Sequence, residues 1–509
     1  MLLRSLIIYA VCIAVALVLG CVVANIDDVM SFYMGIALLS LLLVPMLLKW
    51  HHFWLIAAWN TSAVLFFVPG RPTVLLGLIF VSLGISVLQH ALDRKREFVN
   101  APSIALPVFA ILAVMLVTAK LTGGLGLSLL GSSEVGGKRY IYMLGGIAGY
   151  FALAANRIPP GKALFYAGAF YLVGTTSAIS DMAHFFPPSA FYYILLLFPA
   201  TNWWEGDNEK FVVGGQEIGR LGGIAAGCIA LASWLLAMYG IGGIFNLRKF
   251  WRLPLFLLAM FGCLAGGYRA TFVTFCLLVG AVFLLEGKFK SRYLPGMICG
   301  VLLVFVAFLP FTDKLPLAMQ RSLAVIPYIK LDVDARGQAE DTTAWRERLW
   351  LRILPEVPKY LLLGKGLSIS AADLAQVTSF GSSTEESEGS ALASDFHSGP
   401  LSVIITFGLA GVFTFVWLLY AGFRGLYNNY RYGDPELQRV NTFLLAAFIA
   451  RTVMFLFVFG SYFGDLAQFT GILGLSMAIN GGIRKPVPVP ARRSAGEMSL
   501  TRVPAHAMR

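Results

Sequence analysis

Long apolar runs joined by short polar connections make up most of the chain, which has 509 residues. A helix that crosses a bilayer needs about 20 mainly apolar residues, and runs of this kind recur throughout the sequence. A transmembrane β-barrel would show short segments of alternating polarity instead. The pattern therefore predicts an all-α polytopic membrane protein with about fourteen transmembrane helices. The expected spans are 5–25, 32–48, 52–68, 72–92, 102–120, 139–156, 161–182, 217–240, 251–267, 270–286, 293–311, 399–423, 440–459 and 465–482.

Composition and charge agree with this class of protein. Hydrophobic residues make up 58% of the chain and charged residues only 13%, as is typical of membrane proteins with several helices. The net charge of +12 does not indicate nucleic-acid binding, because the lysines and arginines occur in short clusters between apolar runs. No basic stripe has the interleaved aromatic residues of a nucleic-acid surface. We therefore expect membrane lipids as partners and no nucleic acid.

The distribution of lysine and arginine predicts the orientation of the helices. With the N-terminus in the cytoplasm, 22 of the 39 Lys and Arg residues fall on the cytoplasmic side and seven in the short loops opposite. Cytoplasmic loops of membrane proteins are enriched in these residues. The asymmetry predicts a multi-pass protein with both termini in the cytoplasm.

One long polar stretch, 312–397, interrupts the apolar pattern and is extracytoplasmic in this orientation. Within it, the Ser/Thr/Glu-rich segment 378–390 is expected to be mobile and to act as a lid, because its composition cannot bury a core. The stretch divides the chain into five regions. These are N-terminal membrane helices at 1–210, membrane helices carrying Arg220 and Arg269 at 211–311, an extracytoplasmic catalytic loop containing short helices at 312–397, C-terminal membrane helices at 398–482 and a disordered cytoplasmic tail at 483–509.

The run 345–354 within this loop fits an amphipathic helix. At about 100° per residue, one apolar face holds Trp345, Leu349, Trp350 and Ile353, and the other side carries Arg348 and Arg352. Arg346 differs from those two arginines because it falls within the apolar arc. An arginine in that position requires an anionic partner, and its planar fork suits a phosphate.

Other charged residues at the same membrane boundary are candidates for chemistry. His397, the one histidine of the long loop, directly precedes a membrane helix. A lone histidine is usually structural, but one beside arginines at this boundary suits proton transfer, since imidazole titrates near pH ~6.5. Arg269 and Arg220 each lie at the start of an expected span. Two interpretations are open for such an arginine: a side chain that snorkels to the membrane surface, or a ligand for an anion. His184 borders a short apolar run, 190–200, next to the same boundary.

Arg451 lies inside an expected span, where a charge costs about 2.5–3.5 kcal/mol. Its partner is either structural, such as Asp465 on the next span, or a substrate phosphate, and the sequence favours neither. Arg348, Trp350 and Lys365 complete the set of candidate substrate-binding residues.

Three segments together resemble the O-antigen ligase and O-antigen polymerase superfamily. The segment GGYRATFVTFCLLVGAVFL around Arg269 is similar to that family's span-opening arginine segment. WRERLWLRILPEVPKYLLLGKGL is similar to its loop pattern of an arginine four residues before a tryptophan, followed by a glycine-rich element. HSGPLSVIITFGLAGVFTFVWLL is similar to its histidine segment and the helix that follows. The likeness covers roughly 210–425, with Ser398 where the family often has Asn and three leucines before Gly364 in place of a shorter spacing.

The resemblance implies a metal-independent, inverting glycosyltransferase of the GT-C type that needs no cofactor. Such an enzyme moves a glycan from undecaprenyl diphosphate to a hydroxyl on the lipid A-core, on a growing glycan or on a protein. It works in the bacterial inner membrane during lipopolysaccharide or exopolysaccharide assembly. By motif position, Arg269 and Arg346 would bind the diphosphate, and His397 would activate the acceptor.

Three other interpretations remain open at this point. A metal-dependent GT-C enzyme would use Asp27 and Asp28 in the first extracytoplasmic loop. A polysaccharide flippase or transporter would have a similar number of spans, although transporters usually show internal repeats and paired broken helices. A non-catalytic assembly scaffold is the third, and it would not depend on Arg269 or His397.

Overall fold

The computed structural model describes residues 29–93, 98–124, 136–184, 192–199, 211–213, 216–218, 221–290, 309–326, 329–368 and 396–486, with single positions or short pieces in 13–24 and 294–299. These residues are helical apart from connections and one short antiparallel hairpin. In that hairpin β1 (Phe211–Val213) pairs with β2 (Gln216–Ile218). Apart from this hairpin, the all-α expectation is confirmed for the described residues.

The helices follow one another in the order that the apolar runs predict. Their bounds are α2 Val29–Ala57, α3 Val74–Leu92, α4 Pro102–Thr122, α5 Gly137–Ala154, α6 Pro160–Leu172, α7 Tyr192–Leu197, α8 Gly222–Ile244, α9 Arg252–Ala265, α10 Arg269–Leu285, α12 Leu317–Leu323, α13 Val333–Ile353, α14 Val357–Tyr360, α17 Gly399–Tyr432, α18 Gln438–Val453 and α19 Tyr462–Asn480. The irregular helices include the 3-10 helix η2 (Val173–His184) and the π-helix η11 (Met454–Val458).

Six helical segments in the described residues are long and apolar enough to cross a membrane, and α9 and α10 are shorter apolar helices. This finding agrees with a polytopic membrane protein. One expected span is wrong. The span 32–48 lies within α2, and a non-helical Trp50 separates it from the next segment as expected, but that segment ends at Ala57 rather than continuing to 68, and the chain then turns. The side-chain amide of Asn60 donates to the carbonyl oxygen of Phe170 at 2.7 Å, so polar contacts replace helical ones there.

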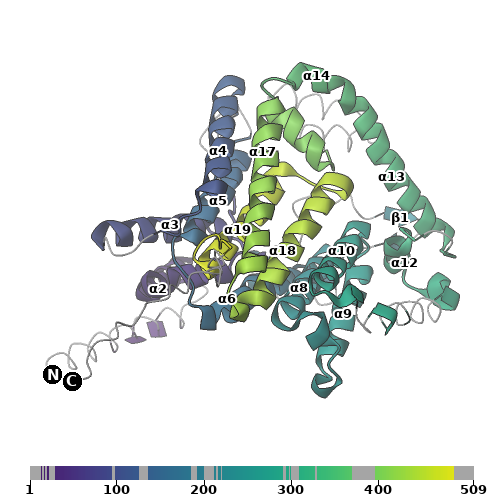
Figure 1. Ribbon diagram of the computed structural model, residues 1–509, viewed down its shortest axis with the longest axis horizontal. Helices are drawn as coiled ribbons and strands as arrows, with labels where there is room; N and C mark the ends of the chain where they lie inside the picture. Colours follow the sequence, from purple (N-terminus) through teal and green to yellow (C-terminus); the bar gives the residue numbers. More distant parts are fainter. Residues whose placement is uncertain are drawn as a thin grey trace, which may run out of the picture.

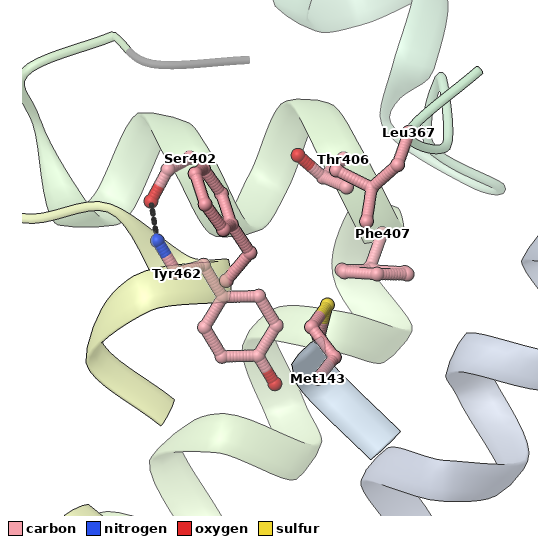
Figure 2. Close-up of a pocket in the computed structure, with 7 residues that line it drawn as sticks. Met143, Leu367, Ser402, Thr406, Phe407 and Tyr462 are labelled. Atoms are coloured by element: carbon pink, nitrogen blue, oxygen red, sulfur yellow. Dashed lines mark hydrogen bonds between the residues drawn. The ribbon is translucent and has the colours of Figure 1, made fainter. Parts of the chain in front are cut away.

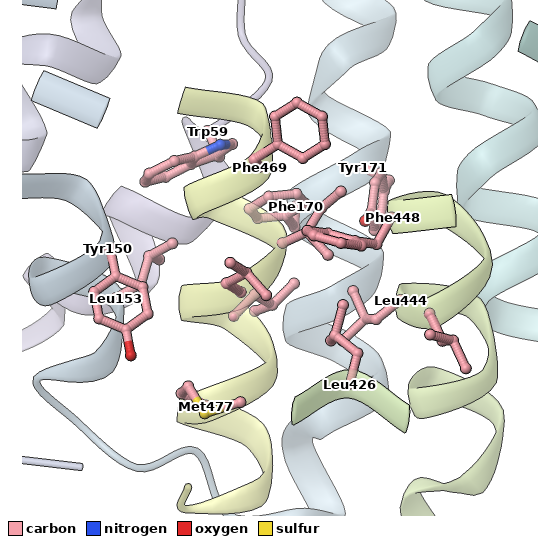
Figure 3. Close-up of a cluster of buried hydrophobic side chains, with 14 of the residues drawn as sticks. Trp59, Tyr150, Leu153, Phe170, Tyr171, Leu426, Leu444, Phe448, Phe469 and Met477 are labelled. Carbon is pink, nitrogen blue, oxygen red and sulfur yellow. The ribbon is translucent and has the colours of Figure 1, made fainter. Parts of the chain in front are cut away.

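The core is organised around α19, which is buried along most of its length and packs most extensively against α5. Figure 3 shows Phe469 of α19 among the aromatic side chains of Trp59, in the turn after α2, Phe170 of α6 and Phe448 of α18. Gly471 allows the Trp59 indole to approach the helix, because a Cβ there would overlap the ring. This packing fixes the end of α19 that carries Tyr462 and Asp465.

The loop helices lie at one side of this core. Figure 1 shows α13 running along the outside of the molecule between α12 and α14, while α17 and α18 lie inside it. The long polar stretch therefore holds one helix of 21 residues, longer than sequence reasoning expected, with short helices at both ends.

Candidate active site

A glycine turn between α9 and α10 positions Arg269 as the first residue of α10. A Cβ at Gly266 would overlap Ala225 of α8, so only glycine allows this close approach. Gly267 has φ of +76°, a left-handed conformation that glycine adopts at little cost. The Gly-Gly pair before Tyr268 therefore has a structural purpose. It reverses the chain tightly against α8 and directs Arg269 toward α13.

The expected amphipathic helix is present in α13, although it begins at Val333 rather than Trp345. Asp332 caps its start by accepting a hydrogen bond from the backbone N–H of Asp334 at 2.9 Å. Leu349 and Ile353 are buried against Phe396 and Ile405, and Trp345 and Trp350 pack at the edge of that cluster. Arg348 and Arg352 are exposed, whereas Arg346 is half-buried. The predicted faces of this helix are confirmed.

Two arginines from other helices reach adjacent threonines on α13. Nη1 of Arg269 donates to the hydroxyl of Thr343 at 3.2 Å. Nη2 of Arg321, in α12, lies 3.5 Å from the hydroxyl of Thr342. Arg346 follows these threonines by one turn of the same helix. Arg269 and Arg346, 77 positions apart in the sequence, are thus brought to neighbouring turns of α13.

His397 lies just before α17, as its position in the sequence predicts. Its ring meets Trp345 edge to face, with 5.1 Å between the centroids, and meets Phe459 at the same distance. The indole N–H of Trp350 donates to the carbonyl oxygen of the preceding Phe396 at 2.8 Å. His397 itself has φ of +49°, which few residues other than glycine adopt. These contacts hold the imidazole against α13 in an uncommon backbone conformation.

Phe459 links this histidine to Arg346. The guanidinium carbon of Arg346 lies 5.9 Å from the centroid of the Phe459 ring, within the range of a cation–π contact. One aromatic side chain thus contacts both a candidate base and a candidate anion ligand. Sequence reasoning did not identify Phe459. The available signal was an aromatic residue at the end of an apolar run, directly before Gly460 and Ser461.

The link that carries Phe459 is held from two sides. Asp465 pairs with Arg451 of α18 at 3.0 Å, and its other carboxylate oxygen accepts from the backbone N–H of Ser461 at 2.9 Å. The hydroxyl of Ser402, on α17, accepts from the backbone N–H of Tyr462 at 3.0 Å. Of the two partners considered for Arg451, the structural one is therefore present in this structure.

The glycine-rich element that follows α14, Gly364-Lys365-Gly366, packs against a break in α17. At Gly408 the helix is interrupted, with φ of +61°. The backbone N–H of Lys365 donates to the carbonyl oxygen of Ile405 at 2.7 Å, and that of Gly366 to Thr406 at 2.9 Å. A Cβ at Gly364 would overlap the backbone of Thr406. Lys365 is thereby fixed to the helix that begins beside His397.

A small pocket lies behind this docking point (Figure 2). It is formed by α5, α17, α19 and the chain at Leu367, and the backbone N–H of Leu367 donates to the hydroxyl of Tyr140 at 3.0 Å. Figure 2 shows Ser402 and Thr406 on one side and Tyr462 on the other. Its lining is Met143, Leu367, Ser402, Thr406, Phe407, Tyr462 and Phe463. Because this lining is apolar or hydroxylic, the pocket is chemically distinct from the arginine-bearing face of α13.

Several predicted positions fall where the structure gives no description. Arg220, the segment 378–390 and the Asp27–Asp28 pair lie outside the described residues, as does the tail from 487 onward. His184 ends η2, and its side chain is likewise outside the description. Among the described residues, no three His, Cys, Asp or Glu side chains gather in a way that could hold a metal ion.

The second residue that sequence reasoning missed is Arg321. It sits in the run LPLAMQRSLAVI, where Gln320, Arg321 and Ser322 interrupt an otherwise apolar segment of the loop. All three are buried, and Arg321 has only 4% of its surface exposed. A polar triplet within an apolar run was the signal that could have identified it.

Comparison with known proteins identifies the region that holds this site. The family model described as O-antigen ligase matches residues 254–416, which run from α9 to α17 and include Arg269, Arg321, Arg346 and His397. No curated protein matches the chain. The matched region contains the first two segments on which the sequence resemblance rests and all but the last three residues of the third. The resemblance is therefore confirmed, and residues 254–416 carry a domain of the O-antigen ligase and polymerase superfamily.

Proposed function

We propose that this chain is a glycosyltransferase that moves a glycan from undecaprenyl diphosphate to a hydroxyl acceptor during surface polysaccharide assembly. The observation that carries the proposal is the shared contact of His397 and Arg346 with Phe459. It places a group that can accept a proton beside a group that can bind a phosphate. The O-antigen ligase match over the same residues supports this chemistry.

In the donor half of the site, Arg346 and Arg269 bind the diphosphate. When the bond between C1 of the sugar and the diphosphate oxygen breaks, the electron pair leaves with the diphosphate, and negative charge accumulates there. Fixed guanidinium groups stabilise that charge, an effect that is often the largest single contribution to catalysis. The half-burial of Arg346 beside Phe459 favours a desolvated and therefore strong contact.

In the acceptor half, His397 takes the proton from the attacking hydroxyl. The hydroxyl oxygen forms the new bond to C1 on the face opposite the departing diphosphate, so the configuration at C1 is inverted. Trp345 and Phe459 hold the imidazole from two sides. The backbone at φ of +49° costs about 1–3 kcal/mol, which is the kind of strain found at functional sites.

The active site faces the extracytoplasmic side of the bacterial inner membrane in this proposal, with both termini in the cytoplasm. The Lys and Arg asymmetry supports that orientation. A tag at Ser383 should be accessible from outside the inner membrane, whereas tags at Lys95 and Lys290 should not. Labelling of Ser383 only after the inner membrane is permeabilised would contradict the orientation.

We also propose that transfer needs no metal ion, because arginines supply the positive charge at the diphosphate. Transfer by the purified chain should persist in excess EDTA. Loss of transfer that Mg²⁺ or Mn²⁺ restores would instead support a metal-dependent reaction, with Asp27 and Asp28 as the residues to mutate first.

Gene deletion separates a ligase from a polymerase. If the chain is a ligase, long glycans should accumulate on the lipid carrier, because they can no longer be transferred to an acceptor. If it is a polymerase, single repeat units should accumulate instead. Unchanged lipid-linked glycans after deletion would contradict both versions. Undecaprenyl-linked glycans trapped on the cytoplasmic face would indicate a flippase.

A further inference from the structure

The short helix α12 holds a buried arginine rigidly beside the donor half of the site. Gln320 donates from its amide to the carbonyl oxygens of Asp313 at 3.1 Å and Leu315 at 2.9 Å, and its amide oxygen accepts from the backbone N–H of Asp332 at 2.6 Å. These contacts fix α12 to the loop on both sides of it. The neighbour of Gln320 in the sequence is Arg321.

On its other side, α12 is joined to the membrane helices. The hydroxyl of Ser322 donates to the carbonyl oxygen of Leu264, the penultimate residue of α9, at 2.9 Å. Ala318 lies against Gly267 of the turn that positions Arg269. Arg321 is therefore anchored on one side to the loop, through Gln320, and on the other side to α9 and the turn that presents Arg269, through Ser322 and Ala318.

The geometry of α13 brings the three arginines to one face. At about 100° per residue, Arg346 projects between the two threonines, about 40° from Thr342 and about 60° from Thr343. Helical side chains lean toward the N-terminus of their helix, so that of Arg346 leans toward the turn that holds both threonines. Arg321 and Arg269 reach those same threonines from α12 and α10.

We propose that Arg321 is a third guanidinium ligand of the donor diphosphate, acting with Arg269 and Arg346; this inference rests on the proposed function. The hydroxyls of Thr342 and Thr343 accept from Arg321 and Arg269 in this structure, and the diphosphate oxygens accept from them in the donor complex. A diphosphate carries more charge and more acceptor oxygens than a monophosphate. Three guanidinium groups from three helices therefore favour binding of the diphosphate over a monophosphate. Arg321 contributes to that selectivity.

The test compares undecaprenyl diphosphate with undecaprenyl monophosphate as ligands of the full-length purified chain in lipid nanodiscs. Arg321→Gln should weaken diphosphate binding about 10–100-fold, as expected for one lost charged hydrogen-bonding group. Arg321→Lys should weaken it as well, because an ammonium keeps the charge but cannot reproduce the planar two-donor contact of a guanidinium. Monophosphate binding should fall much less. Arg336→Gln is the matched control, because Arg336 is an exposed arginine of α13 that donates to the carbonyl oxygen of Ile329.

A second variant separates binding from a merely structural role. Thr342→Val removes the hydroxyl that Arg321 contacts but keeps the arginine, so diphosphate binding should be retained. If Thr342→Val reproduces the loss, Arg321 acts by holding α13, and the inference is overturned. Wild-type diphosphate affinity in folded Arg321→Lys protein would overturn it as well.

The same measurements separate this inference from the proposed function. If Arg269→Ala and Arg346→Ala lose diphosphate binding while both Arg321 variants keep it, only the role of Arg321 is wrong. If all these variants bind undecaprenyl diphosphate like the wild type, the assignment of the donor site to this face of α13 fails too.

Discussion

The ring of His397 and the ring of Phe459 meet edge to face, with 5.1 Å between their centroids and 83° between their planes. The guanidinium carbon of Arg346 lies 5.9 Å from the centroid of that same phenyl ring. The proposed base and a proposed diphosphate ligand are therefore positioned by one side chain. That side chain belongs to the short link between η11 and α19, outside the long polar loop.

Replacing Phe459 should impair catalysis more than stability. Phe459→Leu keeps an apolar side chain but removes an edge-to-face contact worth about 0.5–1.5 kcal/mol and a cation–π contact of about 0.5–1 kcal/mol. We expect transfer to fall about 10-fold, which corresponds to about 1.4 kcal/mol. The control is Phe457→Leu, because Phe457 lies two residues earlier with 77% of its surface exposed. Equal losses of transfer rate in the two variants would refute the positioning role.

The ion pair between Arg451 and Asp465 should stabilise the link that carries Phe459. Asp465→Asn removes the charge opposite Arg451 and weakens the contact with the backbone of Ser461. We expect the free energy of unfolding to fall by about 1.5–3 kcal/mol, and the transfer rate to fall with it.

The exposed pair of Lys359 and Glu356 provides a control for this measurement. A hydrogen bond from Lys359 to Glu356 raises the pKa of the lysine ammonium, yet both side chains are solvated. Glu356→Gln should therefore leave the unfolding temperature almost unchanged. An Asp465→Asn variant as stable as Glu356→Gln would show that the Arg451–Asp465 pair contributes little to the fold.

Much of this arrangement could be predicted from the sequence because it depends on local periodicity. The spacing of Leu349 and Ile353 predicted the buried face of α13, and the half-buried position of Arg346 followed from the same spacing. The start of a membrane helix directly after His397 was equally evident. In each case the signal lies within a few residues along the chain.

The relationships between distant segments could not be predicted in this way. Nothing near Phe459 in the sequence indicates that it meets His397, which lies 62 positions earlier. The break at Gly408 results from backbone pairing with the chain after α14, a tertiary contact between segments about 40 residues apart. The expected span 52–68 was wrong for a similar reason, because the chain leaves the helix at Ala57 and Asn60 then bonds to the carbonyl oxygen of Phe170, 110 positions away.

The docking of the glycine-rich element can be tested by adding one methyl group. Gly364→Ala should destabilise the protein by at least about 1–2 kcal/mol, since Gly364 has φ of +76° and its Cβ would overlap the backbone of Thr406. The matched variant is Gly337→Ala in α13, where a Cβ meets nothing within 4 Å. That change should stabilise the helix by about 0.5–1 kcal/mol. Thermal unfolding of both variants checks the opposite signs, and destabilisation of similar size in both would contradict this account.

Arg346 should be sensitive to the shape of its side chain as well as to its charge. Arg346→Lys keeps the charge but loses the fork that contacts two phosphate oxygens, so turnover should fall about 10²–10³-fold. Arg352→Lys changes an exposed arginine in the last turn of the same helix and should leave turnover nearly unchanged. Single-turnover transfer rates would decide the point. Near-wild-type activity in Arg346→Lys would rule out a two-oxygen contact.

In the proposed mechanism Arg346 binds the donor diphosphate, and His397 takes the proton from the acceptor hydroxyl. The most direct test measures donor binding and glycan transfer separately on purified His397→Ala and Arg346→Ala proteins. His397→Ala should bind the undecaprenyl-diphosphate-linked glycan normally and transfer it about 10²–10⁴-fold more slowly, with partial recovery as the pH rises. Arg346→Ala should lose donor binding. Normal donor binding by Arg346→Ala together with abolished binding by His397→Ala would contradict the account.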